Sequence, residues 1–328
     1  MPELPEVERV RRDLADSVLG RRVASVALGR ADVVRGCAAP ASLLAGARLE
    51  RIDRLGKQLA LVGRASDGSQ PVVCVHLGMT GSLRCGESEW PSGQETQWPS
   101  PAKSLAPAAA AGRADKDTAA TDRSSWEPHL ATRPLDHLAT CPDPHTHVIW
   151  QLAGGGSLWF RDVRRFGGLW TFSDPAALAA GRWARLGPDA LTVQPRALHC
   201  RLSRTGRAIK AALLDQNLIA GLGNIYVDEL LFAAGVAPWA RADALDLPAV
   251  QRLVRQMRRL LRRAIAAGGS TFRDYVDASG EAGGFQTRHR VYGRAGLPCR
   301  RCRGPLAATI VAGRTTVSCP RCQGPSDR

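Results

Sequence analysis

Four cysteines near the C-terminus constrain the fold more than any other feature of this sequence. They form two C-x-x-C pairs, Cys299/Cys302 and Cys319/Cys322, separated by sixteen residues. Thiolates at this spacing are typical of a tetrahedral zinc site without an open position, so we expect one structural Zn²⁺. The residues between the pairs alternate as a β-hairpin would, with Gly313 at the turn. A redox role is the alternative for one C-x-x-C pair, and the presence of two disfavours it.

Length and charge bound the class of protein. The chain has 328 residues, enough for two domains with cores of their own. It carries 45 Lys and Arg against 30 Asp and Glu, and this net charge of +15 favours a polyanionic partner. No apolar run reaches the roughly 18 residues of a spanning helix, so we expect no membrane partner. The other cysteines are scattered, which favours a reducing, cytoplasmic location.

The first half of the chain has the pattern of one helix followed by short strands. Apolar residues recur at three- and four-residue spacing from Val7 to Val18, with Pro5 suited to the first turn and Gly20 to the end. The β-rich runs that follow span residues 23–28, 49–52, 59–62, 72–77, 147–152, 157–160 and 169–172. We therefore expect an N-terminal β-sandwich domain over residues 2–172, with the first helix packed against it.

Residues 87–141 interrupt this pattern. They are rich in Ala, Pro, Ser and Thr without periodicity, so we expect a flexible surface insertion. From about residue 175 the pattern turns helical, and we expect helices at residues 176–180, 195–203, 207–214, 226–234 and 248–267. The fold class is therefore α+β, with a helical domain at residues 173–284 and the zinc finger at residues 285–328.

The N-terminus carries the most reactive group. If Met1 is removed, as a small second residue normally allows, the chain begins with the secondary amine of Pro2, and the Glu3 carboxylate lies beside it. An α-amino group has an ordinary pKa of about 7.7–8.0, so a useful fraction can attack an electrophilic carbon and form a Schiff base. The alternative is an ordinary helix start, at which Glu3 and Glu6 complement the helix dipole.

Two further patterns suggest contacts with phosphate. The turn Gly221-Leu222-Gly223-Asn224 joins two expected helices, and free N–H groups at a helix start suit a DNA phosphate, although such turns often contain glycine without binding anything. Lys57 stands at a strand start in L-G-K-Q, where a plain surface lysine is the commoner case. The strings H-L-G-M-T-G at 76–81 and R-D-V-R-R-F-G at 161–167 are loops whose Met79 and Phe166 would, taken alone, be read as core residues.

These motifs together resemble the bacterial formamidopyrimidine-DNA glycosylases. P-E-L-P-E-V-E at the N-terminus, the two loops, the helix–glycine turn–helix string and the cysteine pairs all stand in that family's order, and the resemblance covers nearly all of the chain outside residues 87–141. It implies a helix–two-turn–helix domain between the β-sandwich and the zinc finger. It also implies base-excision repair, in which oxidised and ring-opened purines leave duplex DNA through a Schiff base on the N-terminal proline, followed by β,δ-elimination.

The resemblance implies a role for each matching residue. Pro2 is the nucleophile, Glu3 the general acid/base and Glu6 a supporting residue, while Lys57 and Arg314 meet phosphate at the β- and δ-elimination sites. The residues that would contact DNA are His76, Met79, Arg164, Phe166, Lys210 and Asn224. The family loop that caps the damaged base corresponds to residues 270–285.

Base flipping gives three of these residues a physical task. Apolar wedges such as Met79 and Phe166 replace the stacking lost when a base leaves the duplex, and Arg164 can bond the orphaned partner base. We expect a monomer that acts on damaged double-stranded DNA in the bacterial cytoplasm, associated with the nucleoid. Two alternatives stay open, a DNA-binding paralogue without catalysis and an endonuclease VIII-like glycosylase for oxidised pyrimidines. Intact Pro2, Glu3 and Lys57 disfavour the first, and Leu4 with the three void-filling residues disfavours the second.

Overall fold

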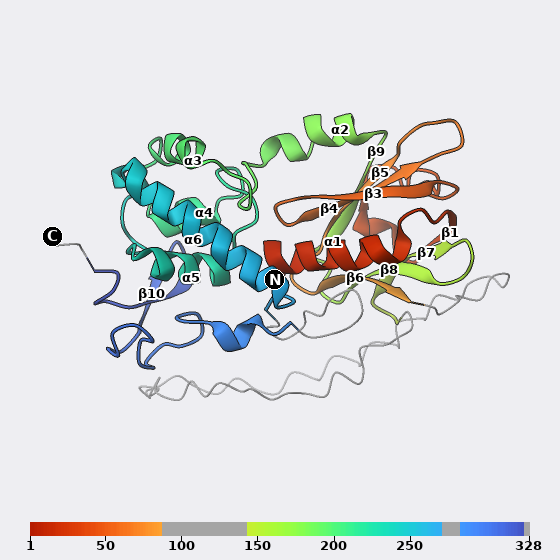
Figure 1. The fold of residues 1–328 in the computed structure, drawn as a ribbon. Coiled ribbons are helices and arrows are strands. Elements are labelled where there is room, and N and C mark those ends of the chain that lie inside the picture. The colour runs from red at the N-terminus through yellow and green to blue at the C-terminus, as the bar shows by residue number, and fades with distance from the viewer. Residues whose placement is uncertain (87–142, 271–282, 325–328) are drawn as a thin grey trace, which may run out of the picture.

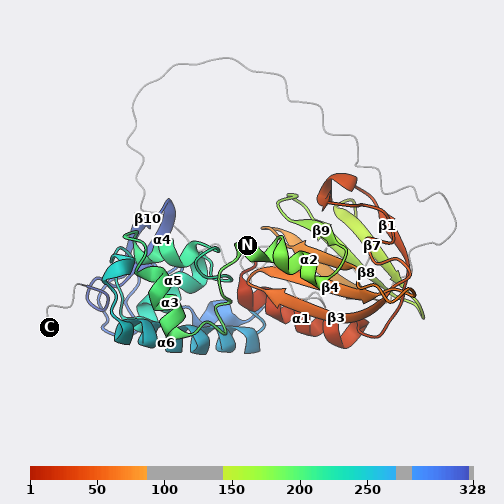
Figure 2. The same cartoon turned by 90° about the horizontal axis from the view of Figure 1, so that it is seen from above.

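The structure is a computed structural model and describes residues 1–86, 143–270 and 283–324. The insertion expected at residues 87–141 lies outside the described residues, as does most of the expected capping loop. Figures 1 and 2 show a β-rich unit and a mainly helical unit side by side, with the N-terminus between them. Across the described ranges, no helix has the length and apolar character that crossing a membrane requires.

Two sheets form the β-rich unit. The strands of the first are β1 (Val23–Leu28), β6 (Gly81–Gly86), β7 (Thr146–Leu152) and β8 (Ser157–Asp162), in the order β1-β7-β8-β6. Those of the second are β2 (Val34–Arg35), β3 (Arg48–Leu55), β4 (Gln58–Arg64), β5 (Val72–His76) and β9 (Gly168–Phe172), in the order β2-β9-β5-β4-β3. Leu61 and Val75 of one sheet share a buried cluster with Trp150 and Phe160 of the other, so the predicted β-sandwich is confirmed.

Two strands were not predicted from the sequence. β6 contains glycine and alternates with Ser82 and Arg84, which lowers its strand propensity, but antiparallel pairing with β8 imposes the strand. Gly81 is required at its start because a Cβ there would lie 2.1 Å from the Leu77 carbonyl oxygen. β2 is two residues long and pairs in parallel with β9, a contact that no local pattern reveals.

The first helix, α1 (Leu4–Val18), joins the two units. Its start has Pro5 in the first turn and a capping box between Glu3 and Glu6. Val7, Val10, Leu14 and Val18 are buried in the sandwich core, whereas Leu4 belongs to the core of the helical unit. Since each end of α1 packs in a different core, the residues ahead of Leu4 are held at the junction of the two units.

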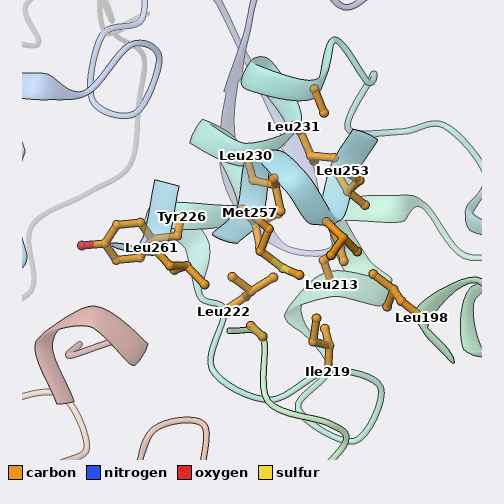
Figure 3. Close-up of a cluster of buried hydrophobic side chains, with 14 of the residues drawn as sticks. Leu198, Leu213, Ile219, Leu222, Tyr226, Leu230, Leu231, Leu253, Met257 and Leu261 are labelled. Atoms are coloured by element: carbon orange, nitrogen blue, oxygen red, sulfur yellow. The ribbon is translucent and has the colours of Figure 1, made fainter. Parts of the chain in front are cut away.

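The helical unit has a single large core. Its helices are α3 (Pro195–Leu202), α4 (Ile209–Leu214), α5 (Asn224–Ala234) and α6 (Leu247–Ala266), and the 3₁₀ turns η4 (Ala242–Ala244) and η5 (Phe285–Arg288) each add a residue to its core. The chain also contains helix α2 (Pro175–Ala180) and the 3₁₀ turns η1 (Ala31–Val33) and η3 (Trp183–Arg185). Leucines from α3 to α6 fill this core, and Tyr226 of α5 lies at its edge with the hydroxyl pointing out of the cluster (Figure 3). Helix α2 packs instead on the outer face of the five-stranded sheet.

The C-terminal hairpin is β10 (Ala307–Val311) paired with β11 (Arg314–Ser318). Its two-residue turn has Ala312 at φ +52° and Gly313 at φ +67°, a combination that matches the twist of a tight hairpin and that glycine tolerates best. A small apolar cluster docks the finger on α5, because Phe232 of α5 packs with Leu306 and Val317. The hairpin and its turn therefore lie where the alternating residues and Gly313 predicted them.

Candidate active site

The Glu3 carboxylate occupies the start of α5. Its oxygens accept hydrogen bonds from the backbone N–H groups of Gly223 at 2.7 Å, Ile225 at 3.0 Å and Tyr226 at 3.4 Å. The side chain is buried, and so is Pro2, whereas Met1 is 50% exposed. The helix-start N–H groups that the sequence suggested for a phosphate therefore already hold a carboxylate of the chain itself.

Close packing of the N-terminus on this turn explains its two glycines. A Cβ on Gly223 would lie 2.3 Å from the Glu3 carboxyl carbon, and one on Gly221, which has φ +113°, would lie 2.5 Å from Leu4 Cδ1. The Leu4 N–H donates to the Gly221 carbonyl oxygen at 3.0 Å. The glycines thus allow the α4–α5 turn to carry the first residues of the chain.

Burial tunes the charges next to the N-terminus. Burial raises the pKa of Glu3, and the charge of Glu6 adds to the rise, whereas the charge of Lys57 and the hydrogen bonds from the Ile225 and Gly223 N–H groups oppose it; the net pKa is about 7. Lys57 lies between β3 and β4 and is 8% exposed; burial lowers its pKa, and Glu3 and Glu6 counter that effect. Within the described ranges the Lys57 ammonium has no hydrogen-bond or ion-pair partner. A group that titrates near pH 7 and an unpaired cation therefore lie together.

Glu6 is the centre of a buried hydrogen-bond chain. One carboxylate oxygen accepts the Glu3 N–H at 2.8 Å, and the other accepts the Tyr226 hydroxyl at 2.6 Å and the Ser270 N–H at 2.7 Å. The Tyr226 hydroxyl lies 3.2 Å from Ser270 Oγ, which lies 3.0 Å from Nε2 of His289. Burial lowers the pKa of His289 to about 4, so its ring is neutral.

Sequence reasoning did not assign Tyr226 or His289 to the site, and it placed Ser270 only at the start of the expected capping loop. Tyr226 and Ser270 lie more than 200 residues from Glu6 in the chain, so no local pattern connects them. The position of Tyr226 directly after G-L-G-N-I was the one available signal. These hydrogen bonds fix the position of the backbone next to the N-terminal amine, because they connect the start of α1 with α5, with the residues after α6 and with the end of η5.

The loops at residues 76–81 and 161–167, which are expected to fill the space left by the flipped base, expose their large side chains and are held in place by Asp162. Met79 is 42% and Phe166 57% exposed, and the Arg164 guanidinium carbon lies 4.7 Å from the centre of the Phe166 ring. The buried Asp162 carboxylate accepts the Thr80 hydroxyl at 2.5 Å, and it also accepts the Gly167 N–H at 2.7 Å. A core location for Met79 and Phe166, the simplest reading of either residue alone, is therefore wrong.

His76 stands at the end of β5, next to these loops. Its Nδ1 accepts the Gly78 N–H at 3.2 Å, and burial, with the charges of Arg182 and Lys57, lowers its pKa to about 4. The neutral ring leaves Nε2 as the nitrogen that can donate.

The side chains of Lys210 and Asn224 form hydrogen bonds with strand β11, the strand that carries Arg314. The Lys210 ammonium is fully buried and bonds Asp228 at 2.6 Å, the Thr316 hydroxyl at 2.8 Å and the Thr315 carbonyl oxygen at 3.1 Å. Asn224 Nδ2 donates to the same carbonyl oxygen at 3.1 Å. Since these three acceptors use all three N–H groups of the ammonium, the phosphate contact expected of Lys210 stays a prediction, and in this structure its bonds hold β11 in place.

Replacing Lys210 with methionine is expected to lower the free energy of unfolding by about 3–5 kcal/mol, because the buried Asp228 carboxyl loses its only cationic partner among the described residues and keeps only the Val317 N–H as a donor. Urea denaturation measures the change. The double variant Lys210→Met/Asp228→Asn removes both charges and should lose much less. If the single variant instead keeps its stability and loses only DNA affinity, the ammonium serves phosphate and not the fold.

The four cysteines meet at one point. Their sulfur atoms all lie within 4.8 Å of one another, with Cys299 and Cys322 3.9 Å apart and Cys302 and Cys319 3.4 Å apart. Four sulfurs at about 2.3 Å from a tetrahedral zinc ion are separated by roughly 3.8 Å, so the thiolates fit Zn²⁺. The backbone N–H groups of Arg301 and Cys322 point at sulfurs at 3.3 and 3.4 Å, as second-sphere donors to thiolates do.

Family comparisons match this architecture in three consecutive parts. Residues 1–169 match the formamidopyrimidine-DNA glycosylase N-terminal domain, residues 186–276 its H2TH domain, and residues 296–324 the zinc finger found in FPG and IleRS. The chain belongs to the formamidopyrimidine-DNA glycosylase family. The resemblance seen in the sequence motifs is thereby confirmed, and so are the expected fold class and the single structural zinc.

Individual members of the family are similar over nearly their whole length. The formamidopyrimidine-DNA glycosylase of Geobacillus kaustophilus is 34% identical over 95% of this chain and 96% of its own, and that of Cereibacter sphaeroides is 38% identical over 91% and 90%. The crystal structure of the MutM (Fpg) protein from Thermus thermophilus has a TM-score of 0.73 at 34% identity, covering 98% of this chain and 99% of that one. Wild-type Lactococcus lactis Fpg, bound to DNA containing N7-benzyl-Fapy-dG, has a TM-score of 0.74 at 28% identity, covering 98% and 100%.

In a glycosylase of this family the zinc supplies folding energy, and its loss has a predictable result. Replacing Cys302 with serine should abolish the zinc content and lower the affinity for abasic-site DNA at least about tenfold, because the hairpin that carries Arg314 loses its anchor. Metal analysis and fluorescence anisotropy measure the two effects. Cys200→Ser, at an exposed cysteine outside the cluster, should change neither. One zinc per chain in Cys302→Ser would contradict the assignment.

Proposed function

We propose that this chain is a bifunctional DNA glycosylase and AP lyase of base-excision repair that removes oxidised and ring-opened purines, such as 8-oxoguanine and formamidopyrimidines, from duplex DNA. The observation that carries the proposal is the N-terminus itself. Its amine would lie next to a buried carboxyl group whose pKa of about 7 suits proton transfer at neutral pH. Both groups are held where the sandwich, α5 and the zinc hairpin meet.

The chemistry begins after removal of Met1. The lone pair of the Pro2 nitrogen forms a bond to the sugar C1′ of the extruded nucleotide, and the bond from C1′ to the base breaks, so the base leaves with the electron pair. Glu3 moves protons to and from the sugar ring oxygen as the ring opens and the iminium forms. The iminium acidifies the neighbouring sugar protons, and β- and then δ-elimination break the strand on both sides of the abasic site.

The surrounding residues have positioning and binding roles in this proposal. The Lys57 cation, unpaired among the described residues, is available for the phosphate at the β-elimination site, and the exposed Arg314 at the hairpin turn reaches the phosphate at the δ-elimination site. His76 and Asn224 add backbone contacts. Met79, Arg164 and Phe166 enter the space that the extruded base leaves. Glu6 organises the pocket through the bonds that it accepts from Glu3, Tyr226 and Ser270.

The organisation of the protein follows from the same proposal. We assign catalysis to residues 2–172, DNA binding to the helix–two-turn–helix unit at residues 173–284 and backbone contact to the zinc finger at residues 285–328. The protein acts as a monomer on damaged double-stranded DNA in the bacterial cytoplasm, where it associates with the nucleoid.

A trapping experiment tests the proposal directly. The protein is incubated with duplex DNA that contains 8-oxoguanine opposite cytosine, borohydride is added, and the adduct is located by digestion and mass spectrometry. We expect a covalent adduct on Pro2. Binding without an adduct, in protein whose mass shows Met1 to be absent, would instead indicate a DNA-binding paralogue. An adduct only with oxidised pyrimidines would indicate an endonuclease VIII-like preference.

Salt should weaken binding steeply. The net charge of +15 and the cationic contacts indicate an interface dominated by phosphate. The logarithm of the affinity should therefore fall linearly with the logarithm of the salt concentration, with a slope of about −0.9 for each phosphate contact. Anisotropy titrations with an abasic-site analogue between 50 and 200 mM salt measure the slope, and Lys57→Met should reduce it by about one contact. A flat response would contradict a phosphate-dominated interface.

A further inference from the structure

An open groove lined by arginines lies between α6, η5 and the first cysteine pair. It has a volume of about 500 Å³, and five arginines contribute to its wall together with Phe232 and Thr287: Arg263, Arg288, Arg290, Arg300 and Arg301. All five arginines are exposed, and the described residues that line the groove include no Asp or Glu. A second hollow of about 230 Å³ shares four of these arginines and extends the groove along α6 to Arg259.

Among the residues that the structure describes, the guanidinium groups in the groove have no acidic partner within hydrogen-bond or ion-pair distance. Arg301 donates to the Phe232 carbonyl oxygen at 3.3 Å, and across the described ranges the side chains of the other four make no hydrogen bond or ion pair. Glu229 borders the second hollow, but one of its carboxylate oxygens already accepts three backbone N–H groups at residues 290–292. Uncompensated charge of this density attracts a polyanion.

The positive surface continues along α6. This helix has six arginines and no acidic residue between Leu247 and Ala266, and its apolar face is buried in the helical core. Arg252 and Arg258 bond backbone carbonyl oxygens, while Arg255, Arg259 and Arg262 are exposed. Twenty residues of helix span about 30 Å, which is close to one turn of duplex DNA at roughly 34 Å.

This surface faces away from the proposed DNA-contacting residues. Figure 2 shows α6 along one side of the helical unit and the β10–β11 hairpin with α4 on the opposite side, with α5 between them. Arg314 lies at the hairpin turn, so a duplex that reaches it runs over the far side of α5 from the groove. The arginines of the groove and of α6 therefore have no task in the chemistry proposed above.

We propose that the groove and the adjoining face of α6 bind the phosphate backbone of a second DNA duplex while the first is held at the active site. This inference rests on the proposed function, since it adds a second duplex to a protein that already holds one. The open, extended shape of the charged surface matches a phosphodiester backbone, whose charges recur about every 1.7 Å along the duplex axis. Two such faces let the protein pass from one DNA segment to another without full release.

The experiment saturates the active site first. A stable complex is formed with a short duplex that contains a tetrahydrofuran abasic-site analogue, and an undamaged duplex with a second fluorophore is then titrated at low salt. We expect ternary complexes with a dissociation constant near the nonspecific range of about 10⁻⁴–10⁻⁶ M. In Arg263→Ala/Arg288→Ala/Arg300→Ala the second affinity should fall at least about tenfold, and the salt slope of the second step by about 3, while the first complex changes less than about twofold.

Two further variants keep the result interpretable. The control variant Arg185→Ala/Arg196→Ala/Arg204→Ala removes three exposed charges outside the groove and should leave binding of the second duplex nearly unchanged. The single variant Arg288→Glu should weaken binding of the second duplex, and it serves as the test if the triple variant of the groove arginines misfolds. A first complex without any ternary complex would overturn this inference alone, whereas failure of the first complex would overturn the proposed function. Tripolyphosphate that binds the wild type and not Arg288→Glu, with no second duplex bound, would assign the groove to a free polyphosphate and also reject the inference.

Discussion

A chain that keeps one extra residue ahead of Pro2 is expected to lose lesion cleavage by about 10³-fold or more, together with the borohydride adduct. The cause is chemical, because an acylated proline nitrogen is a tertiary amide without an available lone pair. Retained Met1 is the simplest such extension, and its 50% exposure shows that a leading residue has room to reach solvent. Cleavage assays on mass-verified protein, with and without the extension, measure the loss.

Binding separates this chemical effect from misfolding. The extended chain should bind a duplex with an abasic-site analogue within a few-fold of the processed protein, because the extension leaves the buried contacts of Glu3 and Leu4 intact. The matched variant Pro2→Ala, once Met1 is removed, keeps a primary amine and should still give an adduct. A full yield of adduct from the extended chain would show that another amine is the nucleophile, either the α-amine of the extension itself or the nearby Lys57, and digestion of the adduct tells the two apart.

Replacing Glu3 with glutamine is expected to slow base release by about 10²–10⁴-fold at neutral pH, since the amide cannot exchange a proton with the sugar. The substitution keeps the shape of the side chain and an oxygen for the α5 N–H groups. Single-turnover kinetics measure the rate, and the wild-type pH profile should contain an ionisation near pH 7 that the variant lacks. Glu50→Gln, at an exposed carboxylate in the β-rich unit, should leave both rate and profile unchanged.

The same substitution has an effect on stability that does not depend on catalysis. Burial raises the pKa of Glu3 from 4.5 to about 7, so the folded state favours the protonated carboxyl. The stability contribution of that proton is fully present below about pH 4.5 and is lost as the pH rises through about 7. The melting temperature of Glu3→Gln relative to the wild type should therefore increase between pH 5 and pH 8.5. A constant difference would mean that Glu3 is ionised throughout.

Local sequence was sufficient for most elements of the fold. Helix α1, strand β1 and the zinc hairpin lie where apolar period, Pro5 and Gly313 predicted them, because each depends on contacts between residues close in the chain. The prediction failed for β6 and β2, where pairing with β8 and β9 decides the conformation. Met79 and Phe166, which taken alone would be read as core residues, are exposed because Asp162 holds their loops on the surface.

The sequence by itself determined the chemical groups of this protein. Pro2 with the neighbouring Glu3, the basic excess and the four cysteines are covalent facts, and their spacing along the chain restricts them to few uses. Only the tertiary structure decided how these groups are tuned, since the pKa of Glu3 depends on burial against α5, more than 200 residues away. The Glu6–Tyr226–Ser270–His289 chain and the fully bonded Lys210 have the same origin. Free energies of desolvation and hydrogen bonding depend on neighbours in space, which distant segments supply.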